Sequence, residues 1–185
     1  MARRVPWLAW RAARAIRSPE LYLTQHQGSY GTTSTGRQYA SYQGVRYAHP
    51  PTGPRRFLSP EPYTAEEGVW DVSTESTIAC PQKSVTFGPD WEVAGQEDCL
   101  LLNIYSPDNH QQAPLPVLVW IHGGGLLFGS GTFQEHGPQH LLDRQVVVVT
   151  VNYRLGALGF LCLADDQVTP HLTPLLPGAW KRRFA

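Results

Sequence analysis

Three apolar runs in the second half of the chain predict buried β-strands. The runs cover residues 100–105, 117–121 and 146–151, and the last consists of valine with a single threonine. Continuous apolar runs of this length, rich in β-branched residues, are typical of strands that are covered on both faces. The pattern therefore predicts a parallel or mixed sheet of the α/β class.

The segments around these runs predict shorter elements. Between Gly28 and Pro60, tyrosines alternate with glycines, which indicates short antiparallel strands. Residues 49–54 contain three prolines, which cannot donate to a strand ladder, so they predict a stiff loop. Residues 81–96 are polar and predict a loop, and residues 139–145 leave room for only a short helix.

Composition and charge exclude several classes of protein. A chain of 185 residues has the usual size of one domain, and 42% hydrophobic with 16% charged residues excludes a wholly disordered chain. No apolar run reaches the roughly 18 residues that a membrane helix needs. Three cysteines are too few for a disulfide-framework protein, and a formal net charge of zero argues against a nucleic-acid binder.

The run at residues 117–121 leads directly into His122 and three consecutive glycines. Glycines lack side chains and adopt positive φ, so their N–H groups can approach a ligand and stabilise a developing negative oxygen. HGGG-type loops of lipases and esterases do this. A plain turn or a phosphate loop is the alternative, but a dinucleotide-binding fingerprint is excluded because Phe128 replaces its last glycine.

Three further stretches resemble signatures of the type-B carboxylesterase and cholinesterase family, including its arthropod esterases. They are E-D-C-L-x-x-N at residues 97–103, N-Y-R-L-G-x-x-G-F-L at residues 152–161, and G-x-x-Y-A-x-P-P-x-G-x-x-R-F at residues 44–57. Their order and spacing agree with the family over about residues 36–165. The resemblance implies the N-terminal part of an α/β-hydrolase fold, a mixed and mostly parallel sheet that stops before the strand carrying the nucleophile.

The resemblance also implies roles for the glycine loop. Gly124 and Gly125, the second and third glycines, would supply the N–H groups of the oxyanion hole. His122 precedes them and is not the family's catalytic histidine, which lies far downstream. Leu126 stands where many relatives have an aromatic residue, so the shape of the acyl pocket is not carried over.

By resemblance the function is carboxylic-ester hydrolysis, with a small-molecule ester as substrate and acyl transfer through a serine to water. The nucleophile would need a G-x-S-x-G elbow, and no serine of this chain has that setting. Ser130 lies between two glycines but belongs to the loop after the oxyanion glycines. We therefore expect nucleophile, acid and base to be missing and the chain alone to be inactive. A non-catalytic adhesion or ligand-binding relative, similar to neuroligins and glutactin, is the alternative.

The cysteines are also interpreted through the family. Cys80 and Cys99 align with its first disulfide, and two reduced buried thiols are the alternative. Cys162 is left over and is interpreted as a small buried hydrophobe.

No metal or cofactor is expected. His136 and His140 are four residues apart, but Pro138 disfavours a helix between them and no third ligand is near. Trp91 lies near the place of the choline-binding tryptophan of cholinesterases, although its spacing does not match closely.

The chain divides into three segments on this interpretation. Residues 1–27 are a basic segment, residues 28–167 form the N-terminal part of the carboxylesterase domain, and residues 168–185 are an aberrant proline-rich tail. A truncated transcript or a faulty gene model explains the tail, and a natural short form is the alternative. The family implies secretion or the endoplasmic-reticulum lumen, but the apolar stretch at residues 5–10 is too short for a signal peptide.

Residues 117–121 are expected to lie beside residues 146–151, with the other flank open. In the family fold the nucleophile strand covers that flank. An edge strand without a charge or a proline inside it is a template for pairing with another chain. We therefore expect the chain to be poorly soluble and not to form a stable monomer.

Overall fold

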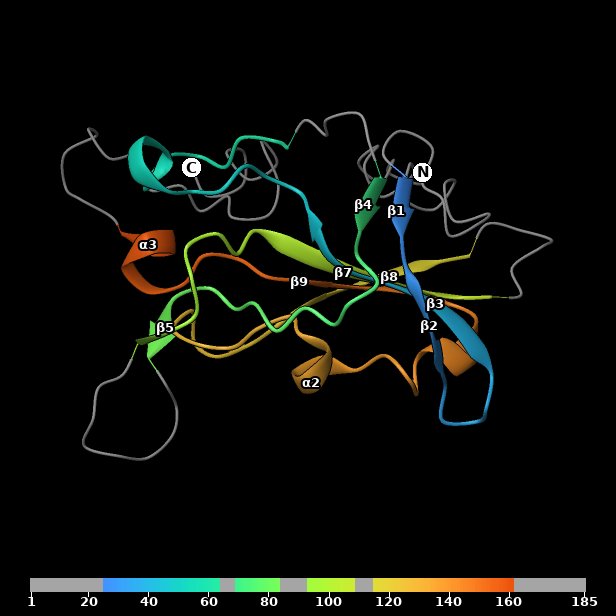
Figure 1. Cartoon of the computed structure of the whole chain (residues 1–185). Coiled ribbons are helices and arrows are strands. Elements are labelled where there is room, and N and C mark those ends of the chain that lie inside the picture. Colours follow the sequence, from blue (N-terminus) through green and yellow to red (C-terminus); the bar gives the residue numbers. More distant parts are fainter. Residues whose placement is uncertain (1–24, 64–68, 84–92, 109–114, 162–185) are drawn as a thin grey trace, which may run out of the picture.

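A computed structural model describes residues 25–63, 69–83, 93–108 and 115–161 of the chain. Its elements are shown in Figure 1. The strands are β1 (Gln25–Gln27), β2 (Ser29–Thr32), β3 (Gln38–Arg46), β4 (Val69–Asp71), β5 (Gln82–Lys83), β6 (Val93–Ala94), β7 (Leu101–Pro107), β8 (Val117–Ile121) and β9 (Val147–Val151). The helices are α2 (Phe133–His136) and α3 (Gly156–Phe160), with 3-10 turns η1 (Gly53–Arg55) and η2 (Leu142–Arg144).

The main sheet has five strands in the order β2-β3-β7-β9-β8. The sheet is mixed, as expected, and the apolar runs form β7, β8 and β9. Its described part is mostly antiparallel, which corrects the expectation of a mostly parallel sheet: the β2–β3, β3–β7 and β7–β9 pairs are antiparallel, and only β8–β9 is parallel. Parallel strands need a crossover connection, and within the described residues only the segment between β8 and β9 supplies one in this sheet.

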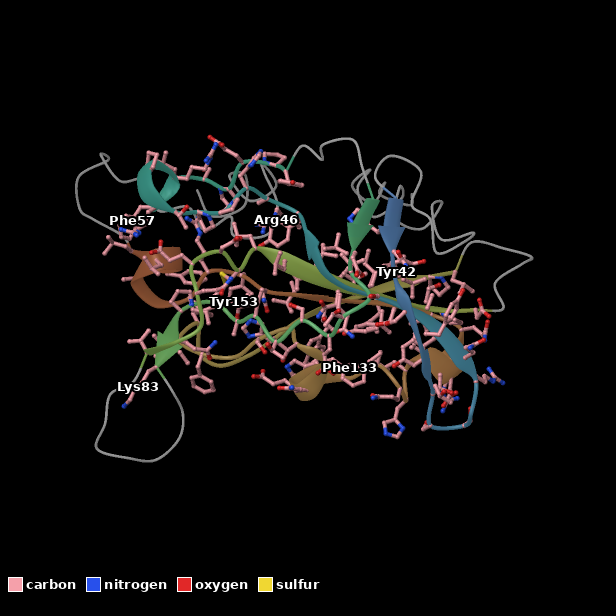
Figure 2. The ribbon with its side chains drawn as sticks, viewed as in Figure 1. Tyr42, Arg46, Phe57, Lys83, Phe133 and Tyr153 are labelled. Atoms are coloured by element: carbon pink, nitrogen blue, oxygen red, sulfur yellow. A yellow bond between two sulfur atoms is a disulfide. The ribbon has the colours of Figure 1, made fainter. Side chains whose placement is uncertain are left out.

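The core lies on both faces of β7 and β9. On one face Tyr42 and Ile104 pack with alternate valines of β9. On the other face Tyr105 packs with Val148, Leu142 of η2 and Phe133 of α2. Figure 2 labels Tyr42 of β3 and Phe133 of α2. Figure 1 shows α2 on one side of the sheet and the β1–β4 pair on the opposite side. Because successive side chains of a strand point to opposite faces, cover on both sides buries every residue of β9.

The strand β8 differs from the expectation that all three apolar runs are covered on both faces. The exposed fractions are 37% for Leu118, 52% for Val119, 43% for Trp120 and 53% for Ile121. Within the described residues β8 is the last strand of this sheet, and β9 lies along only one of its edges. Residues 117–121 do lie beside β9, as expected, and the structure gives the register, with Val117 opposite Val147.

The remaining segments agree with the sequence in outline. The prolines of residues 49–54 lie in a loop that ends in η1, and residues 139–145 hold only η2. The segment 81–96 is not a loop throughout, because Gln82–Lys83 and Val93–Ala94 pair as a short antiparallel ladder. Among the described helices none is long and apolar enough to span a membrane.

A carboxylate ties the β2–β3 turn to η2. Asp143 accepts hydrogen bonds from the hydroxyls of Thr33 at 2.6 Å, Ser34 at 2.8 Å and Thr35 at 2.5 Å. These hydrogen bonds lower the pKa of Asp143 to about 2, and those from Thr33 and Thr35 have the largest effects. These hydrogen bonds hold the β2–β3 hairpin, which forms one margin of the main sheet, against η2, which contains Leu142.

Candidate functional site

The glycine loop begins where β8 ends. Three consecutive residues have left-handed backbone, with φ of +110° at Gly124, +60° at Gly125 and +64° at Leu126. Among the described residues, no group accepts a hydrogen bond from the N–H of Gly124 or Gly125. Two adjacent N–H groups thus have no partner within the described part of the chain, in the segment where the sequence predicts an oxyanion hole.

A tight turn explains why Gly124 has no side chain. Its carbonyl oxygen accepts hydrogen bonds from the N–H groups of Leu127 at 3.0 Å and Phe128 at 3.3 Å. A Cβ atom on Gly124 would lie 1.9 Å from the carbonyl oxygen of Phe128, so no other residue fits without opening the turn. A Cβ atom on Gly125 would meet nothing within 4 Å, so its glycine is not required by a close contact at that position.

His122 and Tyr153 hold the N-terminal end of the glycine loop. The two rings stack with centroids 4.4 Å apart, and the Tyr153 hydroxyl donates to the His122 carbonyl at 2.8 Å. His122 is buried, its Nδ1 lies 2.9 Å from the Gly123 oxygen, and its Nε2 has no partner among the described groups. Burial lowers the pKa of His122, while the Gly123 oxygen opposes that shift. A buried ring with a lowered pKa suits a structural role rather than proton transfer.

The second end of the loop is held through the backbone of Gly131. Its N–H donates to Oδ1 of Asn152 at 2.7 Å. Its carbonyl accepts from Nδ2 of Asn103 at 2.8 Å and from the hydroxyl of Thr150 at 2.5 Å. Asn103 also accepts from the Gly44 N–H at 2.8 Å, where β3 shifts register. Asn103, from the motif at residues 97–103, and Asn152, from the motif at residues 152–161, therefore both form hydrogen bonds with the backbone of Gly131.

The chain is similar to known proteins. The family model described as "Carboxylesterase family" matches residues 20–170. The chain belongs to the carboxylesterase family. It is 41% identical over 143 residues to juvenile hormone esterase of Tribolium castaneum, covering 76% of this chain and 24% of that protein. It is 40% identical over 149 residues to para-nitrobenzyl esterase of Bacillus subtilis, covering 79% of this chain and 30% of that protein.

Solved structures of carboxylesterases match the fold. The crystal structure of Manduca sexta juvenile hormone esterase aligns with TM-score 0.60 and 36% identity, over 72% of this chain and 28% of that one. A thermophilic PNB esterase aligns with TM-score 0.63 and 35% identity, over 76% of this chain and 28% of that one. The described sheet is therefore part of an α/β-hydrolase fold. The chain spans about a quarter of the length of the curated relatives it matches.

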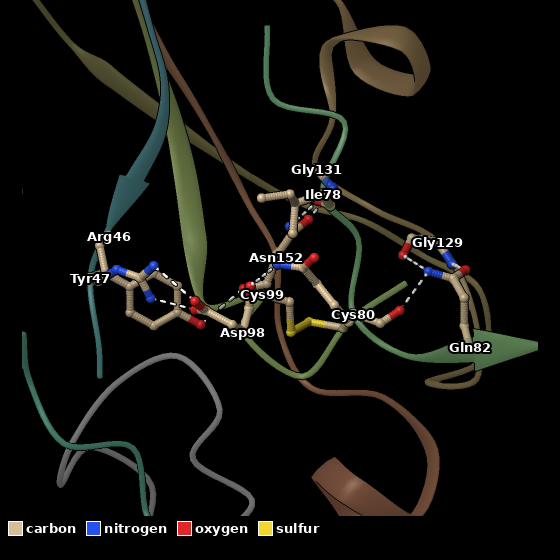
Figure 3. The surroundings of a disulfide bond; sticks show 11 residues. Arg46, Tyr47, Ile78, Cys80, Gln82, Asp98, Cys99, Gly129, Gly131 and Asn152 are labelled. Atoms are coloured by element: carbon tan, nitrogen blue, oxygen red, sulfur yellow. Dashed lines mark hydrogen bonds and ion pairs between the residues drawn. A yellow bond between two sulfur atoms is a disulfide. The ribbon is translucent and has the colours of Figure 1, made fainter. Parts of the chain in front are cut away.

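The disulfide that the resemblance implies is present. Cys80 and Cys99 are bonded, with Cα atoms 5.0 Å apart, and both are buried. Figure 3 shows the disulfide beside Asn152 and Gln82. Gln82 lies two residues after Cys80 and clamps the loop, because its Oε1 accepts from the Gly129 N–H at 2.8 Å and its Nε2 donates to the Gly129 carbonyl at 3.1 Å. The bond thus anchors a segment that holds the glycine loop from outside.

Two ion pairs connect the carboxylesterase motifs with each other. Asp98 accepts a two-pronged contact from the guanidinium of Arg46. Glu97 accepts from Nε of Arg56 at 2.7 Å and from Nη2 at 2.6 Å, and these hydrogen bonds lower the pKa of Glu97. Both pairs join the segment of residues 44–57 to the segment that leads into β7. Arg154 lies near them and is buried, and burial lowers its pKa.

The other candidates of the sequence are not brought into this site. His136 lies against the ring of Trp120, with centroids 5.3 Å apart, and the described residues hold no cluster of three or more potential metal ligands. Ser130 is buried, and its hydroxyl lies 2.8 Å from that of Thr132. Trp91 and Cys162 fall outside the described residues. Leu126 is exposed, and its carbonyl accepts from the Gly156 N–H at 2.7 Å, which ties the loop to α3.

Sequence reasoning missed the residues that hold the loop. Asn103 and Asn152 were part of quoted motifs without a role, and Gln82 belonged to a segment that predicted only a loop. The available signal was polarity, since an asparagine inside the apolar run 100–105 and another directly after 146–151 need buried hydrogen-bond partners.

Proposed function

We propose that this chain supplies the oxyanion-hole half of a serine carboxylesterase, with Gly124 and Gly125 as the N–H donors. The observation that carries the proposal is the pair of adjacent left-handed glycines whose N–H groups have no partner among the described residues. In the reaction, serine attack on an ester carbonyl forms a tetrahedral intermediate, whose oxygen accepts from these N–H groups. An acyl-enzyme forms as the alcohol leaves, and water then releases the acid.

The rigid surroundings of the loop support this role. Oxyanion donors act because they are already oriented, so no reorganisation is needed as charge develops. Tyr153, Gln82 and the two asparagines hold the segment on both sides of the glycines. Left-handed backbone at Leu126, a non-glycine residue, is strain of the kind that collects at functional sites.

The nucleophile would come from residues that this 185-residue sequence does not contain, since none of its serines lies in a G-x-S-x-G elbow. We expect the purified chain to hydrolyse p-nitrophenyl esters no faster than a denatured control. We also expect no labelling by a fluorophosphonate probe. Saturable turnover that an organophosphate titrates would overturn this expectation.

A chimera tests the donors themselves. Residues 28–161 would replace the matching segment of the Bacillus subtilis para-nitrobenzyl esterase, which supplies its own nucleophile, acid and base. In an active chimera, Gly125→Ala should lower kcat by up to about 10²–10³, the loss seen when an oxyanion donor fails, with a smaller change in KM. The added methyl group would meet no atom within 4 Å, but it would strain the backbone at a φ of +60° and so disturb the orientation of the N–H.

Gly36→Ala is the matched control. Gly36 lies in the β2–β3 turn with φ of +86°, and a Cβ there also meets nothing within 4 Å. Both substitutions impose the same kind of backbone strain, so their effects on stability should be similar. Equal activity of the two variants would overturn the role of Gly125.

A further inference from the structure

The glycine loop closes on itself at Gly129. This residue has left-handed backbone, with φ of +110°, and a Cβ atom on it would lie 2.5 Å from Nδ1 of His122 and 2.8 Å from the carbonyl oxygen of Gly123. Just before it, the N–H of Phe128 donates to the carbonyl of Gly124 at 3.3 Å. The end of the loop therefore packs against its beginning, and a shift of Gly129 would displace the donor glycines between them.

A side chain from a segment distant in the sequence holds Gly129 through both of its backbone groups. Oε1 of Gln82 accepts from the Gly129 N–H at 2.8 Å, and Nε2 donates to the Gly129 carbonyl at 3.1 Å, as Figure 3 shows. A primary amide carries a donor and an acceptor on one planar group, so it satisfies both backbone groups at once. The contact imitates the paired hydrogen bonds that two residues exchange in an antiparallel ladder.

Gln82 is itself fixed by its surroundings. Its Nε2 also donates to the carbonyl of Cys80 at 3.1 Å, and its backbone lies opposite Ala94 in the β5–β6 ladder. Cys80 is buried and is bonded to Cys99, which lies two residues before β7. A side chain that its neighbours lock in place holds a site more precisely than one on an unsupported loop. The disulfide segment thus gives the glycine loop a support that is joined to the main sheet.

We propose that Gln82 is a positioning residue for ester hydrolysis, which orients the N–H groups of Gly124 and Gly125 by holding Gly129 from outside the loop. The inference rests on the proposed function, because it takes these N–H groups as the oxyanion donors. Such donors act when they are oriented before charge develops, so a looser loop weakens transition-state binding more than ground-state binding. Loss of Gln82 should therefore lower kcat and leave KM nearly unchanged.

The full 185-residue chain carries the first test. Gln82→Met keeps the length of the side chain and removes the amide. NMR relaxation of the backbone amides should give order parameters of about 0.85 at Gly124 and Gly125 in the unaltered chain, and below about 0.6 in the variant. The amide of Gly129 should exchange about tenfold faster, because it has lost its hydrogen-bond partner.

Gln96→Met is the matched control. Gln96 belongs to the same disulfide segment, and its amide donates to the Asp98 carbonyl at 3.0 Å and not to the glycine loop. This variant should leave the order parameters of the two donor glycines and the exchange of Gly129 unchanged. Rigid donor glycines in Gln82→Met, or the same loosening in Gln96→Met, would overturn the proposal.

The chimera with para-nitrobenzyl esterase supplies the kinetic test. Gln82→Met should lower kcat about tenfold through the loss of its two hydrogen bonds, with KM within about twofold and the same unfolding temperature as Gln96→Met. Gly125→Ala separates the two claims. If Gly125→Ala lowers kcat and Gln82→Met does not, the positioning role is wrong and the oxyanion role stands. If neither variant lowers kcat, the proposed function fails, and the inference that rests on it fails as well.

Discussion

The neighbouring strands β8 and β9 are both short, almost wholly apolar segments, yet they occupy opposite environments. All five residues of β9 are buried, whereas four of the five residues of β8 are exposed. β9 lies between β7 and β8 and is packed on both faces, whereas β8 is the last strand among the described residues of the sheet. An apolar run therefore predicts that a strand forms, but the cover on that strand depends on the neighbours that the rest of the fold provides.

The largest expected effect comes from placing the same charge at paired positions of the two strands. Val149 and Val119 are register partners, with exposed fractions of 8% and 52%. Val149→Lys should cost more than about 4 kcal/mol of unfolding free energy, because it loses a packed side chain and buries an unpaired charge. Val119→Lys should change the stability of the dilute monomer by no more than about 0.5 kcal/mol.

Urea unfolding followed by tryptophan fluorescence measures both variants. Val149→Thr serves as control, since it keeps the branched shape without a charge and should fall between the two lysine variants. Similar losses for the two lysine variants would mean that β8 is covered in solution in a way that its exposure does not indicate.

The sequence predicted the strands much better than it predicted their surroundings. Periodicity and β-branched residues located β7, β8 and β9 to within one or two residues, and the motif resemblance gave the fold and the disulfide. It could not give the exposure of β8, because a local pattern contains no information on which strand ends a sheet. The sequence also could not predict the hydrogen bonds between Gln82 and Gly129. These two residues are brought together by the disulfide and the turn, not by sequence spacing.

The second prediction concerns the disulfide, whose Cys99 lies two residues before β7 and away from the β8 edge. Cys80→Ser with Cys99→Ser should lower the unfolding free energy by about 3 kcal/mol, because the bond closes a loop with a sequence separation of 19 residues. Hydrogen exchange should accelerate at Leu101 and Leu102, next to Cys99, more than at β8. Cys162→Ser is the control, and non-reducing peptide mapping should first confirm the pairing in secreted material. Equal stability of oxidised and reduced protein would contradict this account.

The third prediction concerns the hydrogen bonds of Asn152, the residue that follows β9. Asn152→Ala would leave the N–H of Gly131 and the carbonyl of Ile78 without their partners, at a cost of about 2 kcal/mol for buried groups. Gln96→Ala removes an exposed amide that donates to the Asp98 carbonyl at 3.0 Å, and should cost less than about 0.5 kcal/mol. Thermal unfolding of both variants makes the comparison. If Gln96→Ala lost as much stability as Asn152→Ala, the buried hydrogen bonds of Asn152 would have no special importance for stability.

The smallest expected effect is the pH dependence that His122 contributes at the end of β8. Burial lowers the pKa of His122 below its ordinary value of 6.5, although the Gly123 oxygen and the nearby Glu135 oppose the shift and His136 adds to it. The unfolded chain therefore binds a proton more readily than the folded chain in the window just below pH 6.5. Because stability rises with pH wherever the unfolded state holds more protons, this contribution is complete above pH 6.5 and decreases as the pH falls. Urea unfolding at a series of pH values should show a shallower acid slope for His122→Gln than for the unaltered chain, whatever the absolute stability of the variant. Identical slopes would mean that His122 titrates alike in both states, and that the site where β8 enters the glycine loop is as open to solvent as β8 itself.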